Sequence, residues 1–172
     1  MKDDDWVPLA EVARAHGVRG ELRLRLFNED SDVLLDVDEV LVRLKDGTSH
    51  EVSVDKARRA NEAILMKLYS VDDRDRADDL RGAHICVRRG DFPPLDDGEF
   101  YVCDITGAPV FVLGAPYGKV VTVRDYPTIG ALVVKRDTDG REVEVPLVEN
   151  YVERVDASLP EVRLHSVDGL AE

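Results

Sequence analysis

Apolar and polar residues alternate along short segments of this chain, a pattern typical of half-buried β-strands. The alternation is clearest in ELRLRLF, residues 21–27, where three leucines would face one side of a sheet and Glu21, Arg23 and Arg25 the other. A second run, residues 40–44, returns through residues 51–54 after an Asp-Gly turn, which is typical of a β-hairpin. Residues 63–69 and 84–88 are predicted to form further strands.

One segment in this half of the chain lacks the alternation. Residues 71–82, VDDRDRADDLRG, place Ala77 and Leu80 three positions apart, carry acids at the start and reach Gly82 at the end. Acids in the first turn and a glycine after the last turn favour a helix, so we predict one short helix here. Residues 91–98 follow soon after and combine two prolines with a glycine and acidic residues, which is typical of an interdomain linker.

Beyond this linker the strand candidates are short and regularly separated by glycines, as in a small meandering barrel. They cover residues 100–103, 109–113, 119–123, 131–135, 142–145, 151–155 and 161–165. The sequence therefore predicts an all-β fold with two small β-barrels joined by a short linker, and one short helix near the end of the first domain. We expect a first domain at residues 1–90, a linker at 91–98 and a second domain at 99–172.

Charge is distributed unevenly over this chain of 172 residues, whose net charge is −13. Residues 1–90 carry 16 Lys and Arg against 20 Asp and Glu, whereas residues 91–172 carry 7 against 16. An acidic surface repels nucleic acid and attracts basic proteins, although it also serves solubility alone. The chain has no apolar run of the ~18 residues that span a bilayer, and its acidic start is unlike a signal peptide, so we expect a cytoplasmic protein.

The sequence offers little for catalysis. It has no Gly-x-Ser-x-Gly elbow and no phosphate-binding glycine motif, and its four histidines are scattered without ligand spacing. Cys86 and Cys103 lie in apolar, strand-like runs and are expected to be packed thiols. We expect no catalytic residue, no metal and no cofactor. The one enzymatic interpretation left open is an active site hidden at the interface between the two barrels.

The segment AHGVRGELRLR is the most informative part of the first half. Gly17 and Gly20 bracket a tight loop, and residues 14–25 hold four arginines against Glu21. Arginine forks bind phosphates in a bidentate manner, so RNA contact is one interpretation and a solvated outer strand face is the other. The candidate RNA-binding residues are Arg14, Arg19, Arg23 and Arg25.

The segment EFYVCDITG after the linker carries two adjacent aromatic residues, Phe100 and Tyr101. On a strand they would point to opposite faces of the sheet. One interpretation is that both rings pack in the core or between the domains. The other is that the exposed ring is an anchor for a partner protein.

Together these segments resemble the RimM family of ribosome maturation factors, and the likeness extends through nearly the whole chain. The family's AHGxxGE motif is matched by residues 15–21, with His16, Gly17 and Gly20 in the loop; its DRxxAxxLxG element is resembled by residues 73–82. The family's EYYxxDLxG element reads EFYVCDITG at residues 99–107, and its GxV, LVV and IPxV elements have counterparts at residues 118–120, 132–134 and 145–148.

The resemblance implies a six-stranded N-terminal barrel followed by a PRC-type barrel. It also implies a non-enzymatic assembly chaperone in ribosome biogenesis that binds the precursor of the small ribosomal subunit. The implied contacts are the head protein called small-subunit ribosomal protein nineteen, through Phe100 and Tyr101, and the rRNA nearby. The implied outcome is maturation of the head and rRNA processing.

This chain departs from the family pattern at two loops and one aromatic position. Residues 108–117, APVFVLGAPY, replace an acidic turn, residues 125–131 replace a TGAND-like loop, and Phe100 replaces a tyrosine. The runner-up interpretation is a barrel-type binding module for another RNA or protein complex, because a shared fold does not fix function.

Overall fold

The computed structural model describes residues 1–170, and contacts along the chain divide it into two compact units, Met1–Pro94 and Leu95–Glu172. Each unit is built around its own β-sheet, and helices are confined to short turns. The prediction of an all-β chain with two β domains is therefore confirmed.

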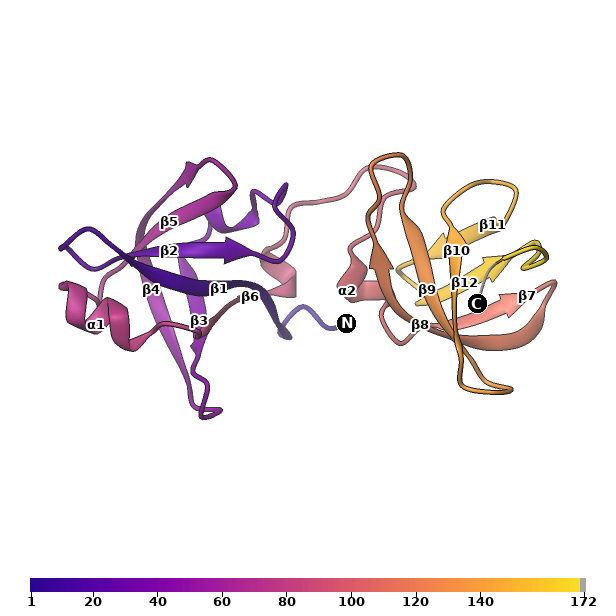
Figure 1. Cartoon of the computed structure of the whole chain (residues 1–172), viewed down its shortest axis with the longest axis horizontal. Helices are drawn as coiled ribbons and strands as arrows, with labels where there is room; N and C mark the ends of the chain where they lie inside the picture. The colour runs from indigo at the N-terminus through magenta and orange to yellow at the C-terminus, as the bar shows by residue number, and fades with distance from the viewer. Residues whose placement is uncertain (171–172) are drawn as a thin grey trace. The chain divides into compact units, whose positions relative to one another are not determined.

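The first unit is a closed barrel in the order β1-β2-β5-β4-β3-β6 (Figure 1). Closure pairs β1 with β6, which lie more than sixty residues apart in the sequence, and leaves the sheet without an exposed edge. Its elements are β1 (Trp6–His16), β2 (Glu21–Leu26), η1 (Val33–Leu35), β3 (Glu39–Arg43), β4 (Ser49–Ala60), β5 (Ala63–Leu68), α1 (Arg74–Asp79), β6 (His84–Arg88) and η2 (Arg89–Asp91).

The barrel interior is filled by the leucines that the alternation predicted. Leu22 and Leu24 are fully buried and stand opposite Met66 and Ile64 of β5, which are buried as well. The predicted helix is confirmed as α1, where the Asp73 side chain accepts a hydrogen bond of 2.9 Å from the backbone N–H of Arg76. Gly82 then adopts a positive φ of 81°, which ends the helical segment.

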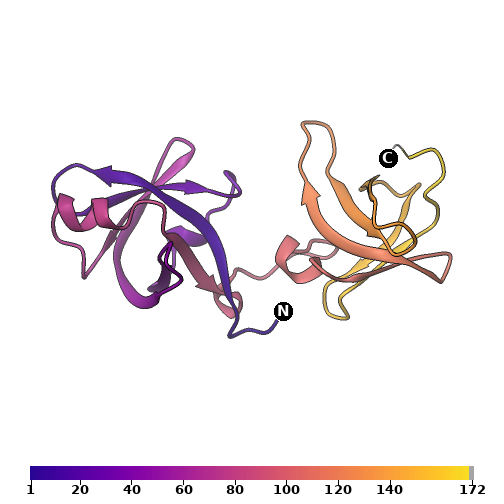
Figure 2. The ribbon, with the colours of Figure 1, turned by 60° about the horizontal axis from the view of Figure 1, so that its bottom comes forward.

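The second unit holds a six-stranded sheet in the order β10-β9-β8-β7-β12-β11. Strands β7 to β10 form a simple meander, and the β11–β12 hairpin then returns so that β12 pairs with β7 in parallel. The sheet is curved (Figure 2). The buried core of the unit is one apolar cluster that includes Ile105, Leu132 and Leu164. The elements are α2 (Val102–Ile105), β7 (Pro109–Val112), β8 (Ala115–Arg124), β9 (Ala131–Arg136), β10 (Glu142–Pro146), β11 (Val152–Asp156) and β12 (Glu161–Leu164).

The strand predicted at residues 100–103 is wrong. Phe100 and Tyr101 lie outside any strand, directly before the helical turn α2, whose backbone hydrogen bond runs from the N–H of Thr106 to the carbonyl of Val102 at 3.0 Å. A short apolar run does not distinguish strand from helix by its periodicity. Burial of Ile105 in the core of the second unit favours the helical turn, and it also places Cys103 on α2 instead of on a strand.

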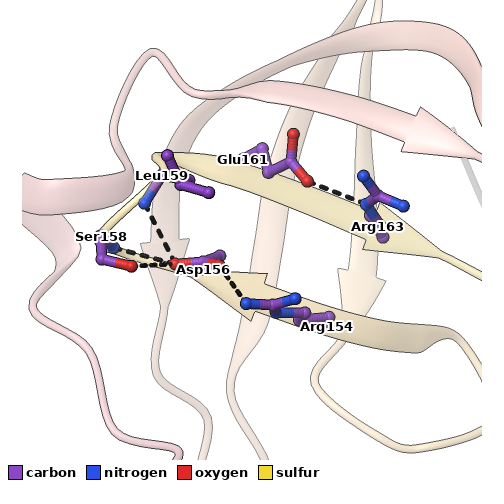
Figure 3. A network of polar contacts seen from close by, with 6 residues as sticks. All are labelled: Arg154, Asp156, Ser158, Leu159, Glu161 and Arg163. Atoms are coloured by element: carbon purple, nitrogen blue, oxygen red, sulfur yellow. Dashed lines mark hydrogen bonds and ion pairs between the residues drawn. The ribbon is translucent and has the colours of Figure 1, made fainter.

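The β11–β12 hairpin is closed by one carboxylate (Figure 3). Asp156 is only 8% exposed, and it accepts hydrogen bonds from the hydroxyl of Ser158 at 2.6 Å and from the backbone N–H groups of Ser158 and Leu159. Arg154 forms an ion pair with the same carboxylate. These groups favour the ionised form, so the Ser158 hydroxyl bond first and the Leu159 backbone bond second lower the pKa of Asp156 below its ordinary value.

Asp156→Asn is expected to flatten the acid dependence of stability. Because the folded-state pKa of Asp156 is lowered, its contribution is present above the unfolded-state value of about 3.9 and is lost as the pH falls through the folded-state value. Thermal unfolding can be followed by circular dichroism between neutral pH and about pH 3. As the pH is lowered, the unfolding temperature should fall more steeply in the unsubstituted protein than in the variant. Parallel curves for the two proteins would contradict this role.

Candidate nucleic-acid interface

Two β-bulges orient basic side chains toward the outside of the first barrel. On β1 the register shifts between Val12, which faces the interior, and Arg14. A one-residue shift reverses the face on which later residues of a strand lie, so Arg14 points outward while Ala15 returns to the interior. A matching shift between Val54 and Lys56 on β4 directs Lys56 and Arg58 outward.

The outward residues form a row across four neighbouring strands. Arg14 stands opposite Arg23, Arg23 opposite Leu65, and Leu65 opposite Arg58, on β1, β2, β5 and β4. Leu65 is only 3% exposed although it lies on the outer face. Its two neighbours in the row are Arg23 and Arg58. We call the set Arg14, Arg19, Arg23, Arg25, Lys56 and Arg58 the basic face.

Part of the charge on the basic face is balanced and part is free. Arg25 pairs with Glu11 at 3.1 Å and Arg58 with Glu21 at 3.2 Å, both at the surface. Within residues 1–170, Arg14, Arg19 and Arg23 have no ion-pair partner. Like charges directly opposite each other on a sheet destabilise it, so the Arg14–Arg23 pair is unfavourable until an anion lies against it. The six cations against Glu11 and Glu21 give this face a charge of +4 in a chain whose net charge is −13.

The loop between β1 and β2 is shaped by its two glycines. Both have positive φ, 67° at Gly17 and 84° at Gly20. They differ in their surroundings: a Cβ at Gly17 would meet nothing within 4 Å, whereas a Cβ at Gly20 would lie 2.2 Å from the carbonyl oxygen of Val71. The hairpin end therefore lies directly against the chain before α1, and this contact holds the loop that presents Arg19.

The structure brings the predicted arginines together and adds to them. Arg14, Arg23 and Arg25 share the outer face, Arg19 projects from the adjoining loop, and His16 is half-buried opposite Glu21. Lys56 and Arg58 were missed by the sequence analysis because β4 was predicted to be short and to end near Val54. The local KARR run at residues 56–59 was the available indication.

The two predicted partner-binding aromatics lie in the second unit and are both half-buried. Phe100 packs against the apolar cluster of that unit, and Tyr101 precedes the first residue of α2. The expected arrangement on opposite faces of a strand is therefore wrong, because the segment is not a strand. Phe100 contributes to the core, and Tyr101 is the better candidate for outside contact.

Other kinds of site receive no support from the described residues. Residues 1–170 contain no group of three or more potential metal-ligating side chains. No helix among them has the length and apolar character needed to cross a membrane. Cys86 is fully buried, and this desolvation raises the pKa of its thiol, which disfavours the reactive thiolate.

The fold and the basic face define a class, a two-domain β-protein with an arginine-rich face on its N-terminal barrel. A family model described as the RimM N-terminal domain matches residues 7–92. The ribosome maturation factor RimM of Sorangium cellulosum is 46% identical over 166 residues, covering 96% of this chain and 97% of that protein. Its counterpart from Sphingopyxis alaskensis is 35% identical over 158 residues, covering 91% and 93%.

One solved structure gives a comparison over nearly the full length. The crystal structure of a putative 16S ribosomal RNA processing protein RimM from Pseudomonas aeruginosa is 25% identical, covers 94% of this chain and 98% of its own, and superposes with a TM-score of 0.48. By the family model and the full-length relatives, this chain belongs to the RimM family.

Proposed function

We propose that this protein is a ribosome maturation factor that acts without catalysis, as an assembly chaperone for the precursor of the small ribosomal subunit. The observation that supports the proposal most directly is the full-length identity of 46% to a protein named ribosome maturation factor. The functional sites proposed below are surfaces, and none of them requires a covalent step. We place the protein in the cytoplasm, where it would meet the assembling subunit.

The two units would contribute different contacts. We assign residues 1–90 to a RimM-type barrel, 91–98 to a linker and 99–172 to a PRC-type barrel. The basic face of the first barrel would bind rRNA phosphates, because arginine forks suit phosphate oxygens and the Arg14–Arg23 pair is relieved by an anion. Residues 91–172, with 16 acidic against 7 basic residues, would approach a basic head protein, small-subunit ribosomal protein nineteen.

The proposed mechanism is differential affinity for one assembly state. A protein shifts an equilibrium only as far as its affinities for the two states differ. By binding immature head components together, through rRNA on one unit and a basic protein on the other, the factor would favour the arrangement that leads to head maturation and rRNA processing. It would dissociate when the mature contacts occupy its binding surfaces.

Co-sedimentation in a sucrose gradient tests this function. The protein is expected to associate with immature small subunits in preference to mature ones. Tyr101→Ala should weaken that association, because Tyr101 is only half-buried and part of its ring is accessible to a partner protein. Phe100→Ala is a less suitable variant, because it removes a core contact.

Tyr69→Ala provides the matched control for the tyrosine. Tyr69 is 65% exposed on the first unit, so its loss removes the same ring from a different surface. Equal weakening by the two substitutions would argue against a partner site at Tyr101. A protein that associates with neither particle would favour the alternative, a barrel-type binding module for another RNA or protein complex.

A further inference from the structure

The tip of the β7–β8 hairpin carries an unusual leucine. Val112 and Ala115 face each other across the hairpin, so Leu113 and Gly114 form a two-residue turn. Leu113 has a positive φ of 48° and Gly114 one of 82°, the combination found in type I′ turns. Asparagine and glycine fill such turns because a branched apolar residue at positive φ is strained.

The side chain of Leu113 gains nothing from the fold that would offset this strain. It is 81% exposed, the highest fraction among the exposed large hydrophobic residues of the described chain. The turn is nevertheless held in place, because the backbone N–H of Leu113 donates to the carbonyl of Leu164 on β12 at 3.1 Å. A rigid hairpin tip that presents a leucine loses little conformational entropy when the leucine is buried by a partner.

The surroundings indicate the kind of partner. Ala115 and Pro116 follow the turn and are exposed, so the tip presents apolar surface instead of charge. Residues 91–172 carry 16 acidic against 7 basic residues, and this unit would therefore attract a basic protein over distance. Figure 2 shows the hairpin extending to the end of the second unit opposite α2.

We propose that Leu113 is an anchor that inserts into an apolar pocket on a basic protein of the immature small subunit. The inference rests on the proposed function, and it adds a contact point on the loop where this chain departs from the family pattern. The strain at Leu113 is then explained by binding, because an asparagine would satisfy the turn but could not fill an apolar pocket.

Leu113→Asn separates the two roles, because it keeps the turn and removes the apolar side chain. The variant is expected to unfold at a temperature about 4 °C higher or more, as strain is relieved, while its affinity for gradient-purified immature small subunits falls roughly 10-fold. Leu159→Asn is the matched control, because Leu159 is 69% exposed at the tip of the β11–β12 hairpin. It should leave the affinity for the particles unchanged.

Each further outcome has a defined meaning. Equal affinity of Leu113→Asn and the unsubstituted protein for the particles overturns the anchor, whereas failure of the unsubstituted protein to bind overturns the proposed function and the anchor with it. Weaker binding of the variant to a protein-free small-subunit rRNA transcript would show that Leu113 contacts RNA instead of a protein, and would also overturn the proposal. Self-association of the unsubstituted protein in sedimentation equilibrium, lost in Leu113→Asn, would replace the basic partner by a second copy of this chain.

Discussion

Replacing Gly20 with alanine is expected to destabilise the first unit by about 3 kcal/mol, a large part of the roughly 5–15 kcal/mol that stabilises a typical domain. Two causes add. The φ of 84° is unfavourable for any residue with a Cβ, and that Cβ would lie 2.2 Å from the carbonyl oxygen of Val71. The atom in the way belongs to the backbone, so relief requires the β1–β2 hairpin to move away from the chain before α1. Chemical denaturation of the full chain measures the change.

Gly17→Ala is the matched control, three residues away in the same loop. Its φ of 67° is also positive, but a Cβ there meets nothing within 4 Å. We therefore expect only the conformational cost of about 1 kcal/mol. Equal losses at the two positions would show that close approach to Val71 contributes nothing, and that the second glycine of the motif serves only the turn.

Neutralising the three unpaired arginines of the basic face, as Arg14→Gln/Arg19→Gln/Arg23→Gln, is expected to weaken binding to a small-subunit rRNA transcript by roughly 100-fold at about 0.1 M salt. Each arginine that contacts a phosphate releases counterions, so the slope of log K against log salt should fall by about 2. Fluorescence anisotropy over a series of salt concentrations measures both quantities. The folded state should gain stability, because Arg14 and Arg23 no longer oppose each other.

A second triple variant provides the charge control. Lys119→Gln/Lys135→Gln/Arg163→Gln removes the same number of positive charges from exposed positions of the second unit. It changes the net charge equally and should leave the salt slope unchanged. If both variants reduce the slope alike, net charge accounts for RNA binding and the basic face is only a solvated strand surface.

Much of the candidate site was visible in the sequence because it depends on local patterns. Residues 21–26 alternate without interruption, so burial of Leu22 and Leu24 fixes the outward direction of Arg23 and Arg25. The two glycines of the β1–β2 loop predicted a tight turn, and both adopt positive φ. The short helix was also predictable, since its acidic cap and terminal glycine lie within one segment.

The rest depended on partners that are distant in the sequence. A bulge is defined by the strand opposite it, so the outward direction of Arg14, Lys56 and Arg58 could not be derived from their own segments. The same holds for residues 100–105, where packing of Ile105 against the second unit's core decided between strand and helical turn.

The sequence by itself therefore determined the β class, the leucine-lined interior of β2, the helix and the family resemblance, because each of these is carried by neighbouring residues. Only the tertiary structure decided the closure of β1 on β6, the parallel pairing of β7 with β12 and the assembly of the basic face. The physical reason is that strand register is set by pairing between distant segments, and a shift of one residue reverses which side chains reach solvent.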